Sequence, residues 1–228
     1  MKMRTTDIQI FQWIKVIIYS FYSMTHATLY TDCSYHPTTR TGAYACYIRC
    51  EEHVEKMTGD LPEKVLMTKS PIHVGELYGI CQGIKQAVSR FGVHFIYVRT
   101  DSKKALEWIE NADNAIDEVK TLITWLREFL HKYDVYVDWK KVQAHQTDGS
   151  SQTWVNNWCD QAAKHRARQL YHIRKKEIVG KKYVSKRYGK VILESIKGNH
   201  MICFKLGNNQ KKIKIQAHQF YADYKRYT

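Results

Sequence analysis

Strand-like and helix-like segments follow one another in an order that leaves few folds open to this chain. Residues 27–33 and 41–50 have the composition of strands, and a turn rich in Pro and Thr separates them. Residues 64–70 are predicted as a third strand, after a break at residues 58–63. Three neighbouring strands with short links predict an antiparallel meander.

Helices and strands alternate in the next part of the chain. From residue 74 to 91 the apolar residues recur with the i, i+3, i+4, i+7 spacing of a helix that buries one stripe. The elements predicted after it are a strand at 94–100, helices at 101–111 and 116–132, a strand at 135–142, a polar loop at 143–152 and a helix at 153–172. A meander followed by this alternation predicts an α/β fold with a mixed sheet and helices on its faces.

The excess of positive charge lies at the C-terminal end. The chain has 36 Lys and Arg against 22 Asp and Glu, and from Lys164 to Thr228 the count is 18 against 3. Such a tail suits a polyanionic partner, because Lys and Arg release the counterions condensed on phosphates. A solvated basic face is the alternative. A membrane surface is less favoured, because the tail has no long apolar run.

The basic tail also contains short apolar runs separated by "KGNH" and "GNNQ", which are typical of hairpin turns. Residues 173–228 are therefore predicted to form a small antiparallel β module that binds nucleic acid, beside a main domain at 27–172 and an N-terminal appendage at 1–26. Aromatic residues in the module could stack on bases, although at least half should form its core: Tyr183, Tyr188, Phe204, Phe220, Tyr221, Tyr224 and Tyr227.

Two further features bear on the compartment. Residues 1–23 contain an apolar patch that Gln12 and Lys15 interrupt, and it is too short and too broken to predict a membrane span. No stable membrane association is expected, although contact of this patch with a membrane and its place in the functional protein stay open. The six cysteines form no C-x-x-C pair, which predicts buried free thiols in a reducing, cytoplasmic setting.

Four acidic residues, Asp32, Glu76, Asp101 and Asp160, stand out by position. Taken singly, Glu76 suits the first turn of a helix, Asp101 could cap the next helix, and Asp160 could be a surface acid. Asp32 is harder to explain, because a carboxylate on an apolar strand must be paired or must bind a cation. Brought together, the four would repel one another unless cations lay between them. The set therefore predicts metal-dependent chemistry.

The order of these motifs resembles the ribonuclease H family over roughly residues 27–170: a strand Asp in "TD-x-S", a helix Glu in "GEL", a strand-end Asp in "TDS", then a His and an N-x-x-x-D helix. The resemblance implies a ribonuclease H-like catalytic domain with a five-stranded mixed sheet in the order 3-2-1-4-5. It also implies that Asp32, Glu76, Asp101 and Asp160 hold two Mg²⁺ ions, with Mn²⁺ as a substitute. His145 would assist product release or proton transfer, and Asn156, Cys33 and Ser34 would contact substrate.

The chain departs from the family pattern at three places, one of which is a longer loop from His145 to Asp160. Cys33 stands where many members have Gly, and Pro71, Ile72 and His73 replace polar residues before the helix Glu. The leading hypothesis is a Mg²⁺-dependent endonuclease that cuts the RNA strand of RNA/DNA hybrids. The basic module, with Lys181, Lys182, Lys186 and Arg187, would hold the duplex. The alternatives are a nuclease of the same fold that acts on branched or single-stranded DNA, and a catalytically silent nucleic-acid-binding protein.

Overall fold

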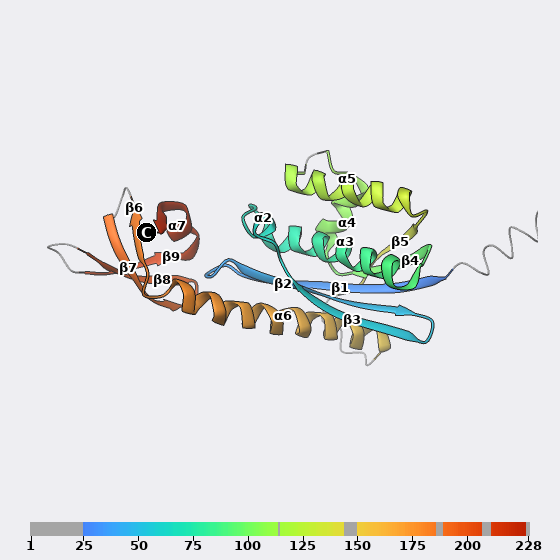
Figure 1. Cartoon of the computed structure of the whole chain (residues 1–228), viewed down its shortest axis with the longest axis horizontal. Helices are drawn as coiled ribbons and strands as arrows, with labels where there is room; N and C mark the ends of the chain where they lie inside the picture. The colour runs from blue at the N-terminus through green and yellow to red at the C-terminus, as the bar shows by residue number, and fades with distance from the viewer. Residues whose placement is uncertain (1–24, 114, 144–149, 186–188, 207–210, 227–228) are drawn as a thin grey trace, which may run out of the picture.

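A five-stranded mixed sheet forms the centre of the main domain (Figure 1). The structure, a computed structural model, describes residues 25–113, 115–143, 150–185, 189–206 and 211–226. The strand order is β3-β2-β1-β4-β5, with β1 antiparallel to β2 and parallel to β4. The predicted fold class and strand order are therefore confirmed. The strands are β1 (His26–His36), β2 (Thr41–Cys50), β3 (His53–Asp60), β4 (Phe95–Thr100) and β5 (Tyr136–Lys141).

The third strand lies earlier in the chain than predicted. Strand β3 covers His53–Asp60, and the predicted segment instead contains the short helix α2 (Glu63–Leu66), which buries Val65. As an edge strand, β3 is paired on one side only, and its residues are exposed or half-buried, so its sequence lacks an apolar signal. Gly59 does not break this strand, because it packs directly against the ring of Tyr44 on β2.

Helices cover both faces of this sheet (Figure 1). One face carries α3 (Pro71–Phe91), α4 (Lys103–Glu110) and α5 (Asp117–Lys132), and the other carries α6 (Ser151–Ile178). Helix α6 does not end near His172 as predicted, but continues through a run of good helix formers to the start of a second sheet. This single helix therefore crosses the predicted boundary between the main domain and the basic module.

Three glycines allow α3 to lie very close to the sheet. Gly75, Gly79 and Gly83 recur every fourth residue and so share one side of the helix. A Cβ atom at Gly79 would lie 2.8 Å from Thr31 Oγ1 and 3.2 Å from Tyr44 Cβ. Larger residues there would push the helix away from β1, so this stripe sets the depth at which the neighbouring Glu76 sits.

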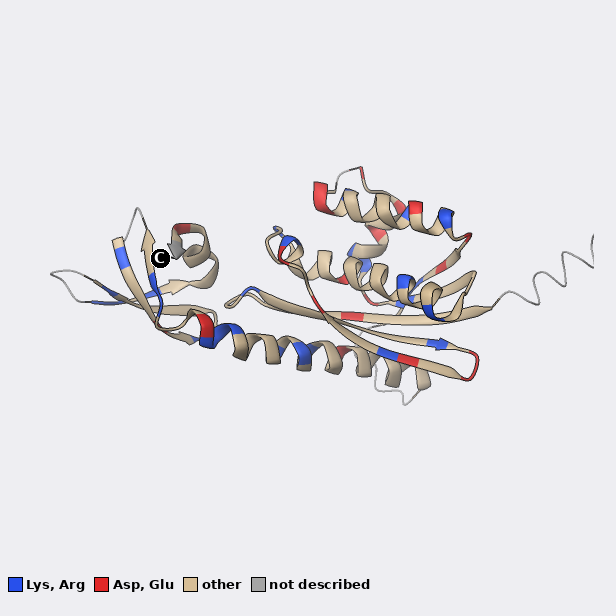
Figure 2. Ribbon diagram, in the orientation of Figure 1, with Lys and Arg blue, Asp and Glu red and all other residues tan. Residues whose placement is uncertain are grey.

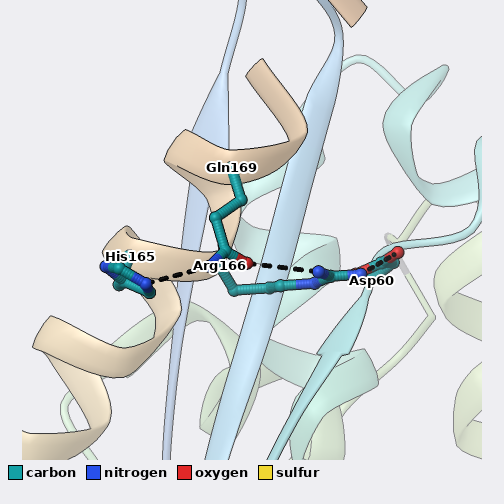
Figure 3. Close-up of polar contacts among 4 residues, drawn as sticks. All are labelled: Asp60, His165, Arg166 and Gln169. Carbon is teal, nitrogen blue, oxygen red and sulfur yellow. Dashed lines mark hydrogen bonds and ion pairs between the residues drawn. The ribbon is translucent and has the colours of Figure 1, made fainter. Parts of the chain in front are cut away.

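An ion pair fastens α6 to the edge strand. The guanidinium of Arg166 donates two hydrogen bonds to Asp60, from Nε to Oδ1 at 2.7 Å and from Nη2 to Oδ2 at 2.9 Å (Figure 3). Arg166 also donates to Gln169 Oε1, which lies one turn along the helix, and the Gln169 amide contacts His165. This bidentate ion pair joins α6 to the edge strand β3.

A second antiparallel sheet follows α6 in the order β10-β6-β7-β8-β9. Its strands are β6 (Lys182–Ser185), β7 (Gly189–Lys197), β8 (His200–Lys205), β9 (Lys212–Gln216) and β10 (Tyr224–Arg226), with helix α7 (Ala217–Asp223) between the last two. The three strands predicted around the turn sequences are thus present, whereas α7 was not predicted. The core of this sheet contains Ile178, Tyr183, Val191, Leu193, Ile196, Met201, Cys203, Ile215, Phe220 and Tyr224.

Helix α7 joins the second sheet to the main domain. The Tyr221 hydroxyl donates a 2.9 Å hydrogen bond to the Thr38 carbonyl oxygen in the turn between β1 and β2. The Arg40 guanidinium lies 4.3 Å from the centre of the Tyr221 ring, which is a cation–π contact. The module therefore touches the same hairpin that carries Asp32 on its first strand.

All six cysteines are buried and unpaired, as predicted. In the described part of the chain, no helix combines the length and apolarity that a membrane crossing requires. The apolar patch of residues 1–23 lies outside the described residues.

Candidate metal centre

Three of the predicted acids lie together beside the central strands. The register of the parallel strands β1 and β4 pairs Tyr30 with Arg99, and Asp32 and Asp101 each follow this pair by two residues, with Asp101 directly after the end of β4. Glu76 reaches them from the second turn of α3. One carboxylate oxygen from each of the three lies within 4.8 Å of the others.

Burial makes this group of carboxylates electrostatically unfavourable. Burial raises the pKa of Asp32 to about 7, with Asp101 and Asp160 adding to the rise. The Cys33 N–H, which donates to Asp32 Oδ1 at 2.6 Å, lowers that pKa in part. Burial, and then the charges of Asp32 and Asp101, also hold the pKa of Glu76 well above its ordinary value. The three groups therefore cannot all ionise near neutral pH without a compensating cation.

The donor set fits a divalent cation. Glu76 is 7% exposed, and its Oε2 atom is buried without a hydrogen-bond partner among the described residues. A buried acceptor left in this way is costly, and a cation would remove the cost. Three closely spaced carboxylates are the hard oxygen ligands that Mg²⁺ and similar ions prefer. Asp32, Glu76 and Asp101 are thus the residues that would hold such an ion.

Asp160 lies near these three residues but is not a member of the group within 4.8 Å. It is buried on α6, and its charge contributes to the raised pKa of Asp32. Lys164, one turn further along α6, places its Nζ atom 2.7 Å from Asp160 Oδ1 and 2.8 Å from Oδ2. The ammonium of Lys164 therefore acts as the counterion of the fourth predicted acid.

A cleft of about 360 Å³ adjoins the carboxylates between α3 and α4. Glu76 and Asp101 line it together with Ile72, His73, Ser102, Lys103, Lys104 and Glu107. The two lysines are not recognisable as site residues from the sequence, because exposed lysines at the start of a helix carry no signal of their own. Their position directly after the "TDS" motif was the available hint.

The predicted substrate contacts fall in different places. Cys33 is 8% exposed and packs in the main core against α3, where its Sγ would lie 2.5 Å from a Cβ at Gly75. Any contact of Cys33 with substrate would therefore come from its backbone. Ser34 is the next residue of β1 and is half-buried. Asn156 is buried, and its Oδ1 atom lacks a hydrogen-bond partner among the described residues.

The remaining predicted residues lie away from this group or outside the described residues. Lys181 and Lys182 are exposed at the start of β6, in the second sheet. His145, Lys186 and Arg187 lie outside the described residues.

Comparison with known proteins assigns the chain to a family. The sequence model of the RNase H family matches residues 24–168, and the chain therefore belongs to this family. No curated protein matches the chain. The family membership and the three carboxylates together identify a nuclease domain of the kind that uses a divalent metal.

Several solved structures are similar to the main domain. RNase H1 of the archaeon Halobacterium salinarum NRC-1 shares 15% identity over 61% of this chain and 96% of its own, with a TM-score of 0.44. The N-terminal RNase H domain of rv2228c from Mycobacterium tuberculosis shares 14% identity over 61% of this chain and 99% of its own, with a TM-score of 0.42. The protease–reverse transcriptase of prototype foamy virus shares 20% over 64% of this chain but only 21% of its own, with a TM-score of 0.48.

Proposed function

We propose that this protein is an endonuclease that hydrolyses the RNA strand of RNA/DNA hybrids with two bound Mg²⁺ ions. The observation that carries the proposal is the group of three carboxylates, in a chain of the RNase H family, whose buried charges need a cation. When bound, such ions activate a water nucleophile and stabilise the leaving oxygen at phosphorus.

The residues of the chain supply binding and orientation. Asp32, Glu76 and Asp101 fix the position of the ions, and the close approach of α3 to β1 keeps Glu76 at the right depth. Lys103 and Lys104 line the adjoining cleft and would contact backbone phosphates. The Lys164 side chain is half exposed and could therefore move to a substrate phosphate. Asp160 would then complete the set of ligands.

The basic tail would add affinity for nucleic acid that does not depend on sequence. Lys and Arg occur along α6 and on strands of the second sheet (Figure 2). We expect the protein to act on nucleic acid inside the cell, and the six free thiols fit a reducing compartment.

A panel of substrates tests the proposal. We expect cleavage of an RNA/DNA hybrid with Mg²⁺ or Mn²⁺, and none of double-stranded RNA or double-stranded DNA. Asp101→Asn should reduce hybrid cleavage by at least about a hundredfold, because it removes a metal ligand and its charge, while the protein still folds and hybrid binding stays near wild type.

Asp113→Asn is the matched control, because Asp113 is exposed between α4 and α5, outside the acidic group. It should cleave like wild type. If the protein preferred to cleave branched or single-stranded DNA, that DNA and not the hybrid would be its substrate. Inactivity on every substrate with both metals would leave only a nucleic-acid-binding role.

A further inference from the structure

One face of the second sheet is apolar at its centre. Strand alternation and register place Val184, Ile192, Ile202 and Phe204 on the face opposite the buried core. All four are half-buried, and none belongs to the core of the sheet or packs against it. We call the face that carries these four residues the open face.

Within the described residues, the open face has no covering element. Helix α7 packs on the other face, where Phe220 joins the core with Tyr183 and Tyr224. Through Tyr221 the same helix contacts the main domain, so the open face lies on the far side of the sheet from α7 (Figure 1). A ligand on the open face would therefore not compete with the contact between the module and the main domain.

Lysines surround the apolar centre. The register places Lys182 and Lys190 beside Ile192 and Val184, and places Lys212 and Lys214 beside Phe204 and Ile202 on the same face. Each of these four lysines is exposed. Glu194 pairs with Lys212 at 2.8 Å, and an exposed ion pair of this kind is weak enough to exchange for a phosphate.

The combination of an aromatic ring, aliphatic side chains and lysines restricts the ligand. A second copy of this face is disfavoured, because two sets of lysines would meet. A duplex presents phosphates but hides the faces of its bases, so it would leave Phe204 unused. A single strand offers both phosphates for lysines and exposed base faces for an aromatic ring.

We propose that the open face binds single-stranded nucleic acid, with Phe204 stacking on a base and the surrounding lysines contacting phosphates. This binding does not require the proposed hydrolysis. During hydrolysis of a hybrid, the bound strand would be an unpaired stretch next to the hybrid. Only this identification of the strand rests on the proposed function.

Equilibrium binding to labelled probes in EDTA tests the site in the full chain. The probes are oligothymidylate and oligouridylate of about 12 nucleotides, and a blunt DNA duplex of the same length. Phe204→Ala should weaken binding of either single strand about tenfold, since one base–aromatic stack is lost. Binding of the duplex should change less than twofold. A loss with only one of the two single strands would still assign the stack to Phe204 and would restrict the ligand to that type of strand.

Three further variants separate stacking from other effects. Phe204→Leu keeps an apolar side chain without a ring and should bind single strands as poorly as Phe204→Ala, whereas Phe204→Trp should bind them like wild type. Lys214→Glu should weaken single-strand binding. Lys205→Glu is its matched control, because Lys205 follows Phe204 in β8 and points to the other side of the sheet.

Distinct results would overturn the inference. If Phe204→Ala weakened the binding of single strands and of the duplex equally, the open face would be a basic surface that binds without stacking. If Phe204→Ala bound single strands like wild type but had a lower sedimentation coefficient than wild type, the open face would be a surface for self-association. Hybrid cleavage is measured separately on a short blunt hybrid. If the protein bound single strands but did not cleave this hybrid, the proposed function would be refuted and the single-strand site would stand.

Discussion

At the scale of single residues, Asp32 links the proposed chemistry to stability. Its pKa of about 7 is raised from 3.8 by burial and by neighbouring carboxylates. The folded state thus holds the Asp32 proton more tightly than the unfolded state does. Without metal, ionising this group therefore costs stability as the pH rises from about 4 to about 7, and the cost stays constant above that range.

The variant Asp32→Asn should reveal this cost. In EDTA it should match wild type near pH 4 and be more stable near pH 8, by up to about 4 kcal/mol, because it has no charge to bury. Thermal or chemical denaturation across the pH range measures the difference. Mg²⁺ should stabilise wild type near pH 8, and do so much less in the variant. A variant that is less stable than wild type at high pH in EDTA would contradict the electrostatic account.

The sequence predicts the acids that lie together in the candidate site, but not the lysines that surround them. Each acid stands in a motif that places it on a strand or a helix, and the parallel register of β1 and β4 then brings Asp32 and Asp101 together. The pairing of Asp160 with Lys164 follows from their i, i+4 spacing on one helix, whereas the place of Asp160 outside the group of three acids depends on how α6 packs on the sheet. Lys103 and Lys104 were missed because exposed lysines at the start of a helix carry no signal of their own.

At the scale of secondary-structure elements, the close contact of α3 with the sheet sets the geometry of the site. Ala is normally favoured over Gly inside a helix by about 1 kcal/mol. At Gly79, however, the new Cβ would meet Thr31 Oγ1 and Tyr44 Cβ, and the latter cannot rotate away. We expect Gly79→Ala to lower the free energy of unfolding by about 1–3 kcal/mol, and to slow cleavage because Glu76 is displaced.

Chemical denaturation and hybrid cleavage measure the two effects of Gly79→Ala. Lys85→Ala is a suitable control, because Lys85 is exposed on the same helix and its change leaves the contact with the sheet intact. A gain of stability in Gly79→Ala would show that helix propensity, and not the close approach, dominates at this position.

The elements also show where pattern recognition fails. Helix α3 was predictable because one stripe of it is buried and repeats every turn. Strand β3 was misplaced because an edge strand buries too little to impose a pattern, while the nearby apolar residues Val65 and Leu66 belong to a helical turn. The end of α6 was misjudged because its final turns leave the sheet, where exposed residues no longer mark one face.

At the scale of the whole molecule, Tyr221 on α7 holds the module against the main domain through its contacts with Thr38 and Arg40. Tyr221→Phe removes the hydrogen bond to the Thr38 carbonyl, worth about 1 kcal/mol, but keeps the ring under Arg40. Tyr221→Ala removes both interactions. We expect faster amide hydrogen exchange in α7 and in the β1–β2 turn, weakly in the first variant and strongly in the second.

Exchange in the central strands should stay as in wild type, because the core of the main domain does not include Tyr221. Tyr133→Phe, at an exposed tyrosine after α5, serves as the control. Faster exchange throughout the protein would instead mean that Tyr221 supports global stability.

Helix α6 has one more consequence, because it carries Asp160 near one end and enters the core of the second sheet at Ile178. Eighteen residues of unbroken helix span roughly 27 Å, about the length of eight base pairs of B-form DNA. A strand held on the module would therefore meet the carboxylates at a set separation. Scission should then recur at a preferred number of nucleotides from the single-strand junction, which a flexible tether would not produce.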